Sequence, residues 1–409
     1  MNKKQTDTVS KQVKNDKTST QTIIFTAILG ASFLIFAFLL FRYNFLILSQ
    51  RFLVLALVLV LGIILFLISK KFDGWKRGLA SGFSLLLSLF LIIGSFYLFK
   101  SFSALGRMVI NEKNTVETQN KEELHAALTE EGFDLPEDFV IEEVVKVKEP
   151  EGDSFSIYIS GIDRYGDIGG ISRTDVNLVM NVNTKTHEIL TTTIPRDSYV
   201  RIAGGGQNEY DKLTHSGIYG IQSSVETIEN LFNIDINYYA KVNFTSLIEI
   251  VDVLNGVDVE NDYAFTTNGG KSFSEGTIHL NGEDALTFSR ERYNLPDGDF
   301  ARGRNHVKVL EAIIRKAISP QILLNYTSLL DVVSTAVETN MPENKIMELI
   351  NQQLASNPNW EFDSVQVKGT GSTGVLPSYA MPGFKLYMYQ LDEQNVKDIS
   401  QMMKDNLGK

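Results

Sequence analysis

The stretch SFSIYISGID at residues 154–163 begins a series of three β-branched, apolar runs, which continues with DVNLVMNVN at 175–183 and HEILTTTIPRD at 187–197. Each run has the length of a strand and ends in turn residues, so we predict three strands here. Amphipathic helical patterns and shorter strands alternate after them. The predicted helices cover residues 216–232, 244–256, 301–318, 325–340, 342–357 and 392–406, and the predicted later strands cover 241–244, 257–262 and 359–369. This pattern predicts an α/β fold, in which a mixed sheet is covered by helices on both faces.

Three uncharged apolar runs precede this region, at residues 23–41, 52–69 and 78–99. At ~1.5 Å per residue, each is about long enough to cross the ~30 Å hydrocarbon core of a bilayer. A helix in a soluble core seldom stays apolar on every face over such a length. A cleaved signal peptide would supply one short run rather than three. We therefore predict three transmembrane helices.

The lysines and arginines around these runs predict their orientation. Five lysines precede the first span, and four basic residues lie in KKFDGWKR at 70–77, whereas the connection at 42–51 has only two arginines. The positive-inside rule then places the N-terminus in the cytoplasm and everything after the third span outside the cell. We divide the chain into a disordered cytoplasmic tail at 1–22, three spans within 23–100, a short accessory segment or stalk at 101–153, and an extracellular domain at 154–409.

The composition of the outer part excludes some classes of function. Residues 112–409 carry 25 basic and 46 acidic side chains, a net charge of −21. Nucleic-acid binding calls for a basic face, so we expect no nucleic-acid partner. The chain has no cysteine, which excludes disulfides and thiol catalysis. The sequence also lacks GxSxG, HExxH and GxxxxGK[ST] motifs.

Arginine is concentrated in a few motifs of this acidic region. Nine arginines follow residue 111, and six of them lie in ISRTD, IPRDSYV and FSRERYNLPDGDFARGR: Arg173, Arg196, Arg290, Arg292, Arg302 and Arg304. The guanidinium fork binds phosphate oxygens with two parallel hydrogen bonds, which lysine cannot do. Residues two apart share a face only in extended chain, so RER and SRTD would aim their charges together if they are extended. The alternative is that these arginines pair with nearby acids such as Glu291, Asp297 and Asp299.

Two aspartates accompany these arginines. Asp163 and Asp175 each lie at the end of a predicted strand or just beyond a turn. Two carboxylates brought together repel unless a cation or a shared proton compensates their charge. Mg²⁺ binds one or two carboxylates together with water and phosphate oxygens, so beside phosphate-binding arginines we expect a Mg²⁺ site. Taken alone, turn aspartates are commonly capping residues.

The order of these motifs resembles the LytR–CpsA–Psr family. It runs GID, SRTDVNLVMNVN, IPRDSYV, DKLTH, NYYAKVNF, DVLNGVDVE, HLNGEDALTFSRERY and DGDFARGRN, densely over 154–320 and more loosely to 409. Three amino-terminal spans resemble the capsule-associated type. The resemblance implies a membrane-anchored phosphotransferase that attaches an anionic glycopolymer, capsular or teichoic-acid-like, from polyprenyl pyrophosphate to peptidoglycan and releases polyprenyl phosphate. It also implies contact with the machinery of capsule or wall synthesis.

The resemblance also implies roles for individual residues. The implied catalytic residues are Arg173, Arg290, Arg292 and Asp299, the last as general base. The implied substrate-binding residues are Arg196, Lys212, Arg302, Arg304 and His306. At position 306 many members of the family would have glutamine. Asp163 and Asp175 would hold Mg²⁺.

Two other functions compete with transfer. One is a non-catalytic membrane sensor or regulator of wall or capsule synthesis. The other is a polyprenyl-pyrophosphate hydrolase that admits water in place of the acceptor, because hydrolysis needs the same metal and arginines.

Overall fold

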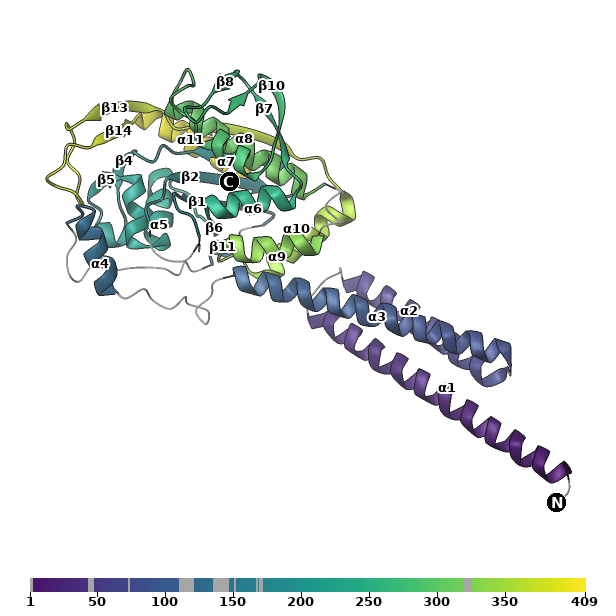
Figure 1. Ribbon diagram of the computed structural model, residues 1–409. Coiled ribbons are helices and arrows are strands. Elements are labelled where there is room, and N and C mark those ends of the chain that lie inside the picture. The colour runs from purple at the N-terminus through teal and green to yellow at the C-terminus, as the bar shows by residue number, and fades with distance from the viewer. Residues whose placement is uncertain are drawn as a thin grey trace. The chain divides into compact units, whose positions relative to one another are not determined.

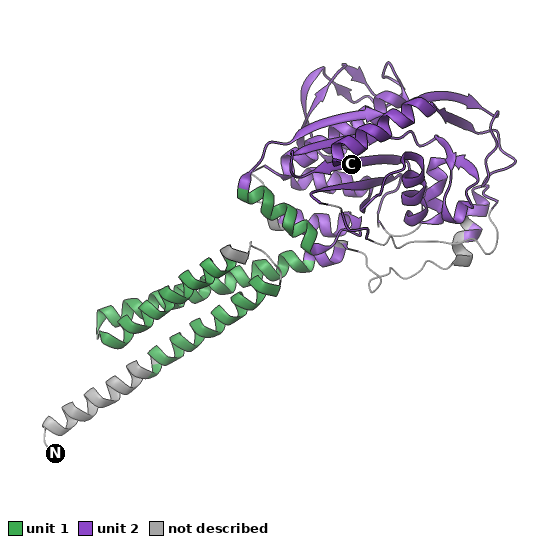
Figure 2. Cartoon of the chain, turned by 180° about the vertical axis from the view of Figure 1, so that it is seen from behind, with its two compact units in different colours: residues 1–103, 344–355 green, residues 104–343, 356–409 purple. Residues whose placement is uncertain are grey.

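A computed structural model of the chain describes residues 3–42, 48–72, 74–109, 121–134, 147–150, 152–166, 168, 172–319 and 326–409 (Figure 1). The chain divides into two compact units, one formed by residues 1–103 and 344–355 and the other by residues 104–343 and 356–409 (Figure 2). The sequence EDFVIEEVVKVKEPEGD at 137–153, which reads as a strand followed by a linker, lies mainly outside the described residues.

The first unit contains the apolar helices α1 (Lys3–Arg42), α2 (Leu48–Lys71) and most of α3 (Trp75–Met108), together with most of α10 (Glu343–Ser356). Three segments are long and apolar enough to cross a membrane: Thr22–Arg42, Arg51–Lys71 and Trp75–Arg107. They contain the three predicted runs. Large side chains such as Leu34 and Phe90 are about two-thirds exposed on these helices, which suits a surrounding of lipid.

The start of α1 differs from the sequence expectation. The helix begins at Lys3, within the tail 1–22 that was predicted to be disordered. The physical reason is that extending a helix costs much less than nucleating one, so a polar segment can continue the helix of the adjoining span.

The second unit is built on a six-stranded mixed sheet of order β11-β6-β1-β2-β3-β12. Its centre is an antiparallel meander, β1 (Ser154–Ile162), β2 (Val176–Asn183) and β3 (Glu188–Thr193). On either side β6 (Tyr238–Asn243) pairs parallel with β1, and β12 (Glu361–Gln366) pairs parallel with β3. The short β11 (Glu338–Thr339) pairs antiparallel with β6. The predicted α/β class and the three opening strands are confirmed.

Helices pack against both faces of this sheet. One core joins Tyr158 and Val179 of the sheet to α5 (Ile221–Phe232) and α11 (Glu393–Leu407). The neighbours of Val179 point to the opposite face and are also buried. On that side α6 (Phe244–Val253), α7 (Gly282–Arg290) and α8 (Asp299–Ala317) form a second core. Burial of both faces explains why β1 and β2 read as continuous apolar runs.

Smaller elements complete the second unit. They are the helices α4 (Lys121–Glu130) and α9 (Tyr326–Ala336), the 3₁₀ helices η1 (Gly204–Gly206) and η2 (Leu213–Tyr219), and the strand pairs β4 (Tyr199–Arg201) with β5 (Tyr210–Lys212), β7 (Val257–Asn261) with β10 (Gly276–Leu280), β8 (Phe265–Thr266) with β9 (Ser272–Phe273), and β13 (Gly369–Thr373) with β14 (Tyr387–Leu391). The sequence predicted α5, α6, α8, α9, α10 and α11, and the Glu/Lys-rich stretch at 111–133 also suggests the short helix α4. It did not predict α7, which has only nine residues, or the β13–β14 hairpin, whose first strand is GTGST.

Candidate functional site

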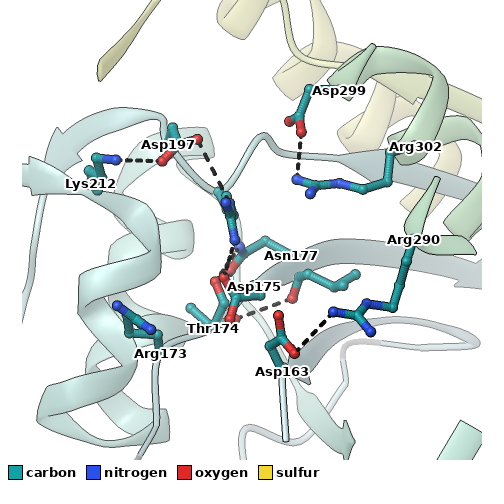
Figure 3. Close-up of polar contacts among 12 residues, drawn as sticks. Asp163, Arg173, Thr174, Asp175, Asn177, Asp197, Lys212, Arg290, Asp299 and Arg302 are labelled. Carbon is teal, nitrogen blue, oxygen red and sulfur yellow. Dashed lines mark hydrogen bonds and ion pairs between the residues drawn. The ribbon is translucent and has the colours of Figure 1, made fainter. Parts of the chain in front are cut away.

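The two aspartates lie at one end of the β1–β2 hairpin (Figure 3). Asp163 directly follows β1 and Asp175 directly precedes β2, and Gly161 pairs with Val176 in the ladder. The Asp175 N–H donates to the Gly161 carbonyl at 2.8 Å. A Cβ at position 161 would lie 2.7 Å from the Val176 Cβ, so glycine permits this close approach. The hairpin therefore brings together two carboxylates that are twelve residues apart in sequence.

Arg196 connects this hairpin end to the turn after β3. Its Nη1 lies 2.6 Å from Oδ1 of Asp175, and its Nε lies 3.8 Å from Oδ2 of Asp197. Lys212 Nζ reaches the other oxygen of Asp197 at 2.7 Å. Burial alone would lower the pKa of Arg196, but the charges of Asp175 and Asp197 outweigh burial and raise it. The result is a partly buried chain of alternating charges, visible at the centre of Figure 3.

Arg302 adds a second guanidinium from the first turn of α8. Its Nη2 lies 2.6 Å from Oδ1 of Asp299, and its side chain is only 14 % exposed. Burial lowers the pKa of Arg302, the charge of Asp299 partly opposes this effect, and the positive charges of Arg196 and Arg292 lower the pKa further. Three guanidinium groups therefore act on one another electrostatically. An anion placed among them would relieve that repulsion.

Arg290 and Arg292 reach the site from different local structure. Arg290 is the last residue of α7, its guanidinium lies 4.3 Å from the centre of the Phe244 ring, and its Nη2 lies 3.7 Å from Oδ1 of Asp163. Arg292 stacks over Tyr293 at 4.4 Å. The RER motif is thus not one extended segment, because α7 includes its first arginine.

Glu291, between these two arginines, has a structural role. It is buried, and its Oε1 accepts hydrogen bonds from the backbone N–H groups of Arg292, Tyr293 and Asn294 at 2.7–3.0 Å. The expected alternative of ion pairing with nearby acids is therefore realised at Asp297 and Asp299. Glu291 instead accepts hydrogen bonds from three backbone N–H groups and from the Asn294 side-chain amide at 3.4 Å.

Arg173 and Arg304 form ion pairs with acids outside the cluster of Arg196, Arg292 and Arg302. Arg304 Nη2 lies 2.7 Å from Oδ2 of Asp297, and both side chains are substantially exposed. Arg173 Nη1 lies 4.0 Å from Oε2 of Glu131, and in Figure 3 no contact joins it to the other arginines drawn. The structure thus brings Arg196, Arg292 and Arg302 into one electrostatic group, with Arg290 at the adjoining Asp163.

His306 lies one helical turn after Arg302 and is partly buried. Burial and the charge of Arg302 lower the pKa of its imidazole to about 3. The ring is therefore neutral at physiological pH and can both donate and accept a hydrogen bond. Neutral imidazole and the glutamine amide share this property.

Sequence reasoning missed a buried polar network beneath the aspartates. The Tyr158 hydroxyl donates to Oδ1 of Asn177 at 2.6 Å, and the Thr174 hydroxyl donates to the same oxygen at 3.0 Å. The Ser160 hydroxyl in turn donates to Thr174 at 3.0 Å. Burial raises the pKa of Tyr158 to about 12, so its hydroxyl stays protonated. This network fixes the residue before Asp175. The signal in the sequence was polar residues at buried positions of apolar strands.

The two carboxylates at the end of the β1–β2 hairpin suit Mg²⁺ only if a substrate supplies further oxygen ligands. Among the residues that the structure describes, no group of three or more His, Cys, Asp or Glu side chains could hold a metal ion. Asp163 and Asp175 supply two carboxylates, each with one oxygen facing an arginine. Mg²⁺ completes such a set with water and phosphate oxygens. Two carboxylates beside a cationic cluster therefore fit a metal that arrives with, or is completed by, a phosphorylated ligand.

Comparison with known proteins identifies the family. The profile of the LytR_cpsA_psr family matches residues 107–405, and the chain belongs to this family. A relative from Bacillus subtilis (strain 168), named polyisoprenyl-teichoic acid–peptidoglycan teichoic acid transferase TagU, is 33% identical over 259 residues, which are 63% of this chain and 79% of the relative. A Bacillus anthracis protein of the same name is 36% identical over 225 residues, 55% of this chain and 72% of the relative.

Solved structures agree with the fold. The crystal structure of B. subtilis TagV shares 25% sequence identity and a TM-score of 0.53, covering 63% of this chain and 98% of that one. A structure described as TagT bound to LI-WTA shares 26% identity and a TM-score of 0.51, covering 67% and 99%. The second unit is therefore a domain of the LytR_cpsA_psr type.

Proposed function

We propose that this protein transfers an anionic glycopolymer from a polyprenyl-pyrophosphate carrier to peptidoglycan. Family membership and relatives named as teichoic acid transferases support this function. The single observation that carries it within this chain is a set of partly buried guanidinium groups at the hairpin end, with Arg196 2.6 Å from Asp175 and Arg302 2.6 Å from Asp299. Guanidinium groups crowded in this way are arranged for a ligand with several negative charges.

The reaction is a phosphoryl transfer. An acceptor sugar hydroxyl attacks the phosphorus that carries the polymer, the phosphoanhydride P–O bond to the carrier breaks, and polyprenyl phosphate leaves. A phosphodiester between polymer and peptidoglycan remains. The hydroxyl proton passes to a base, and Asp299 at the start of α8 is the residue we assign to it. Its ion pair with Arg302 holds the carboxylate in position beside the cationic group.

The arginines act mainly on the transition state. Cleavage of the pyrophosphate increases negative charge on the bridging and peripheral oxygens, and preorganised guanidinium groups stabilise that charge more than they stabilise the bound substrate. The Arg290 guanidinium lies over the Phe244 ring, and its positive charge is close to Asp163. Asp163 and Asp175 would hold Mg²⁺, which supplies further neutralisation of phosphate charge when bound.

The membrane helices fit this substrate. A polyprenyl carrier stays in the bilayer, and a chain anchored by apolar helices keeps its catalytic domain at that surface. The distribution of lysine and arginine places the catalytic domain outside the cell, where peptidoglycan is made. The names of the relatives favour a teichoic-acid-like polymer over a capsular polysaccharide.

The test uses the purified full-length protein in detergent micelles, a synthetic polyprenyl-pyrophosphate-linked sugar and peptidoglycan fragments. Arg196→Ala should lower the transfer rate about 10²–10³-fold, the usual effect of losing one preorganised charge-stabilising group. Arg315→Ala is the matched control, because Arg315 forms an exposed ion pair with Glu311 farther along α8.

The products distinguish the competing functions. Mass spectrometry should find a phosphodiester joined to peptidoglycan. Free phosphorylated sugar in its place would identify a hydrolase, and the absence of either product with the wild-type protein would indicate a sensor. Equal rates for Arg196→Ala and Arg315→Ala would remove the arginine cluster from the mechanism.

A further inference from the structure

Tyr387, on the β13–β14 hairpin, is an exposed aromatic side chain held in a fixed position. A Cβ at Gly371 on the partner strand would overlap the Tyr387 hydroxyl and ring carbons. Gly371 does not have a positive φ, so its backbone does not require glycine. Glycine weakens a strand, and here it leaves room for an aromatic ring to lie across the hairpin. Nevertheless 46% of Tyr387 remains exposed.

The hairpin places Tyr387 beside the candidate active site. Tyr389, two residues along β14, is buried. Its N–H donates to the Asp197 carbonyl at 2.8 Å, and its ring lies 5.8 Å from the Phe300 ring in edge-to-face contact. Phe300 directly follows Asp299. In a strand, residues two apart face the same side, so Tyr387 faces the same side as Tyr389. Figure 1 shows β13 and β14 beside β4, the strand that follows Asp197.

The charges around the Tyr387 hydroxyl agree with this placement. Partial burial raises its pKa, and the carboxylates of Asp197 and Asp299 raise it further. An exposed aromatic face next to two carboxylates has the chemistry of a sugar site. A pyranose ring offers a face of C–H groups to the negative face of an aromatic ring, and its hydroxyl groups donate to carboxylates. A polyprenyl chain would require a dry apolar surface instead.

We infer that Tyr387, supported by Gly371, is the stacking platform for a sugar ring at the reaction centre, and that this sugar is the acceptor glycan. The inference rests on the proposed function for the identity of the acceptor. The acceptor is favoured over a sugar of the donor polymer because β14, which carries Tyr387, contacts Phe300 through Tyr389, and Phe300 directly follows Asp299. Asp299 is the assigned base, which must contact the acceptor hydroxyl. Asp163 and Arg290 belong to the opposite part of the cationic site.

The first experiment measures binding without any reaction. Isothermal titration of the full-length protein in detergent with chitotetraose, a β-1,4-linked N-acetylglucosamine tetrasaccharide, should give a Kd that Tyr387→Ala raises about tenfold, the size of one aromatic stacking contact. Gly371→Ala should raise the Kd similarly although it retains the tyrosine, because the new methyl group displaces the ring. Tyr387→Trp should restore binding to near the wild-type Kd.

The matched control is Tyr263→Ala, which removes a tyrosine of nearly the same exposure, 43%, from the loop after β7. It should leave the Kd unchanged. Thermal unfolding of each variant separates lost binding from lost folding. If Tyr387→Ala and Gly371→Ala bind chitotetraose as the wild type does, or if Tyr263→Ala weakens binding equally, the inference is wrong.

A second experiment distinguishes the two sources of sugar. With farnesyl-pyrophosphoryl N-acetylglucosamine as donor, Tyr387→Ala should raise the KM for the acceptor about tenfold and leave the KM for the donor within about twofold. A raised donor KM alone would overturn the acceptor assignment. If the wild-type protein binds chitotetraose through Tyr387 but transfers nothing, the proposed function fails while the sugar platform stands.

Discussion

His306 on α8 carries a titratable ring into the environment of Arg302, and its pKa of about 3 links stability to pH. Between pH 6.5 and 3 the unfolded chain binds a proton that the folded chain excludes, so acidification destabilises the fold. His306→Gln removes this linkage. As the pH falls below 6, the variant should become more stable relative to the wild type. The difference in their free energies of unfolding should grow by up to about 1.4 kcal/mol per pH unit.

Urea titrations of both proteins at pH 7, 6 and 5 measure this difference. Parallel losses of stability in the two proteins would show that the folded state accepts a proton at His306.

Asp211 and His215 of the DKLTH motif form a buried pair, with Nδ1 of the histidine 2.9 Å from Oδ1 of the aspartate. Asp211 also accepts hydrogen bonds from the Ser378 hydroxyl and the Ala380 N–H, both at 2.8 Å. Burial alone would raise its pKa, but His215 and these donors outweigh burial and lower it. Asp211 therefore joins β5 to the segment before β14.

The structure offers a matched comparison for this pair. His279 and Asp258 form the same contact at 2.7 Å, but both side chains are about 60% exposed. Asp211→Ala should lower the free energy of unfolding by about 3–5 kcal/mol, because it leaves buried donors without an acceptor. Asp258→Ala should cost less than about 1 kcal/mol. Chemical unfolding measures both, and similar losses would show that burial does not set the strength of the pair.

At the scale of elements, η2 packs closely on the segment that leads to Asp175. A Cβ at Gly217 would lie 2.9 Å from the Thr174 nitrogen and even closer to the Ser172 carbonyl oxygen. The Thr174 N–H donates to the Thr214 carbonyl at 3.1 Å. Backbone atoms cannot move aside as a flexible side chain can, so glycine is required here by space.

Gly217→Ala should therefore destabilise the protein by about 1–3 kcal/mol and lower the transfer rate by shifting the SRTD segment. Gly269→Ala is the control, because the nearest atom to a Cβ there is 3.8 Å away. Unfolding and transfer assays on the two variants give the comparison. A Gly217→Ala protein with wild-type stability and rate would mean that the SRTD segment can shift without consequence.

At the scale of the whole molecule, orientation in the membrane is the property to test. The absence of native cysteine allows single cysteines to be introduced as labels. Glu275→Cys lies in the outer domain and Lys76→Cys lies in the basic segment KKFDGWKR at the start of α3, and both positions are exposed. A membrane-impermeant maleimide should label Glu275→Cys in intact cells and label Lys76→Cys only after lysis. The reverse pattern would invert the predicted topology.

The sequence by itself determined the elements that depend on local pattern. Apolar length predicted the three spans, β-branched apolar runs of strand length predicted β1, β2 and β3, and amphipathic spacing predicted the main helices. Arginine and aspartate clustered in short motifs also predicted phosphate and metal chemistry, which depends on these residues meeting in the fold.

Only the tertiary structure decided which of these residues meet. Arg196 reaches Asp175 from the turn after β3, and Arg290 reaches Asp163 from α7, whereas Arg173 and Arg304 pair with Glu131 and Asp297. The partner of a long charged side chain depends on elements that are distant in sequence, and local spacing carries no information about them. For the same reason the position of Tyr387 could not be predicted from the sequence, since it depends on a hairpin that packs against the turn at Asp197.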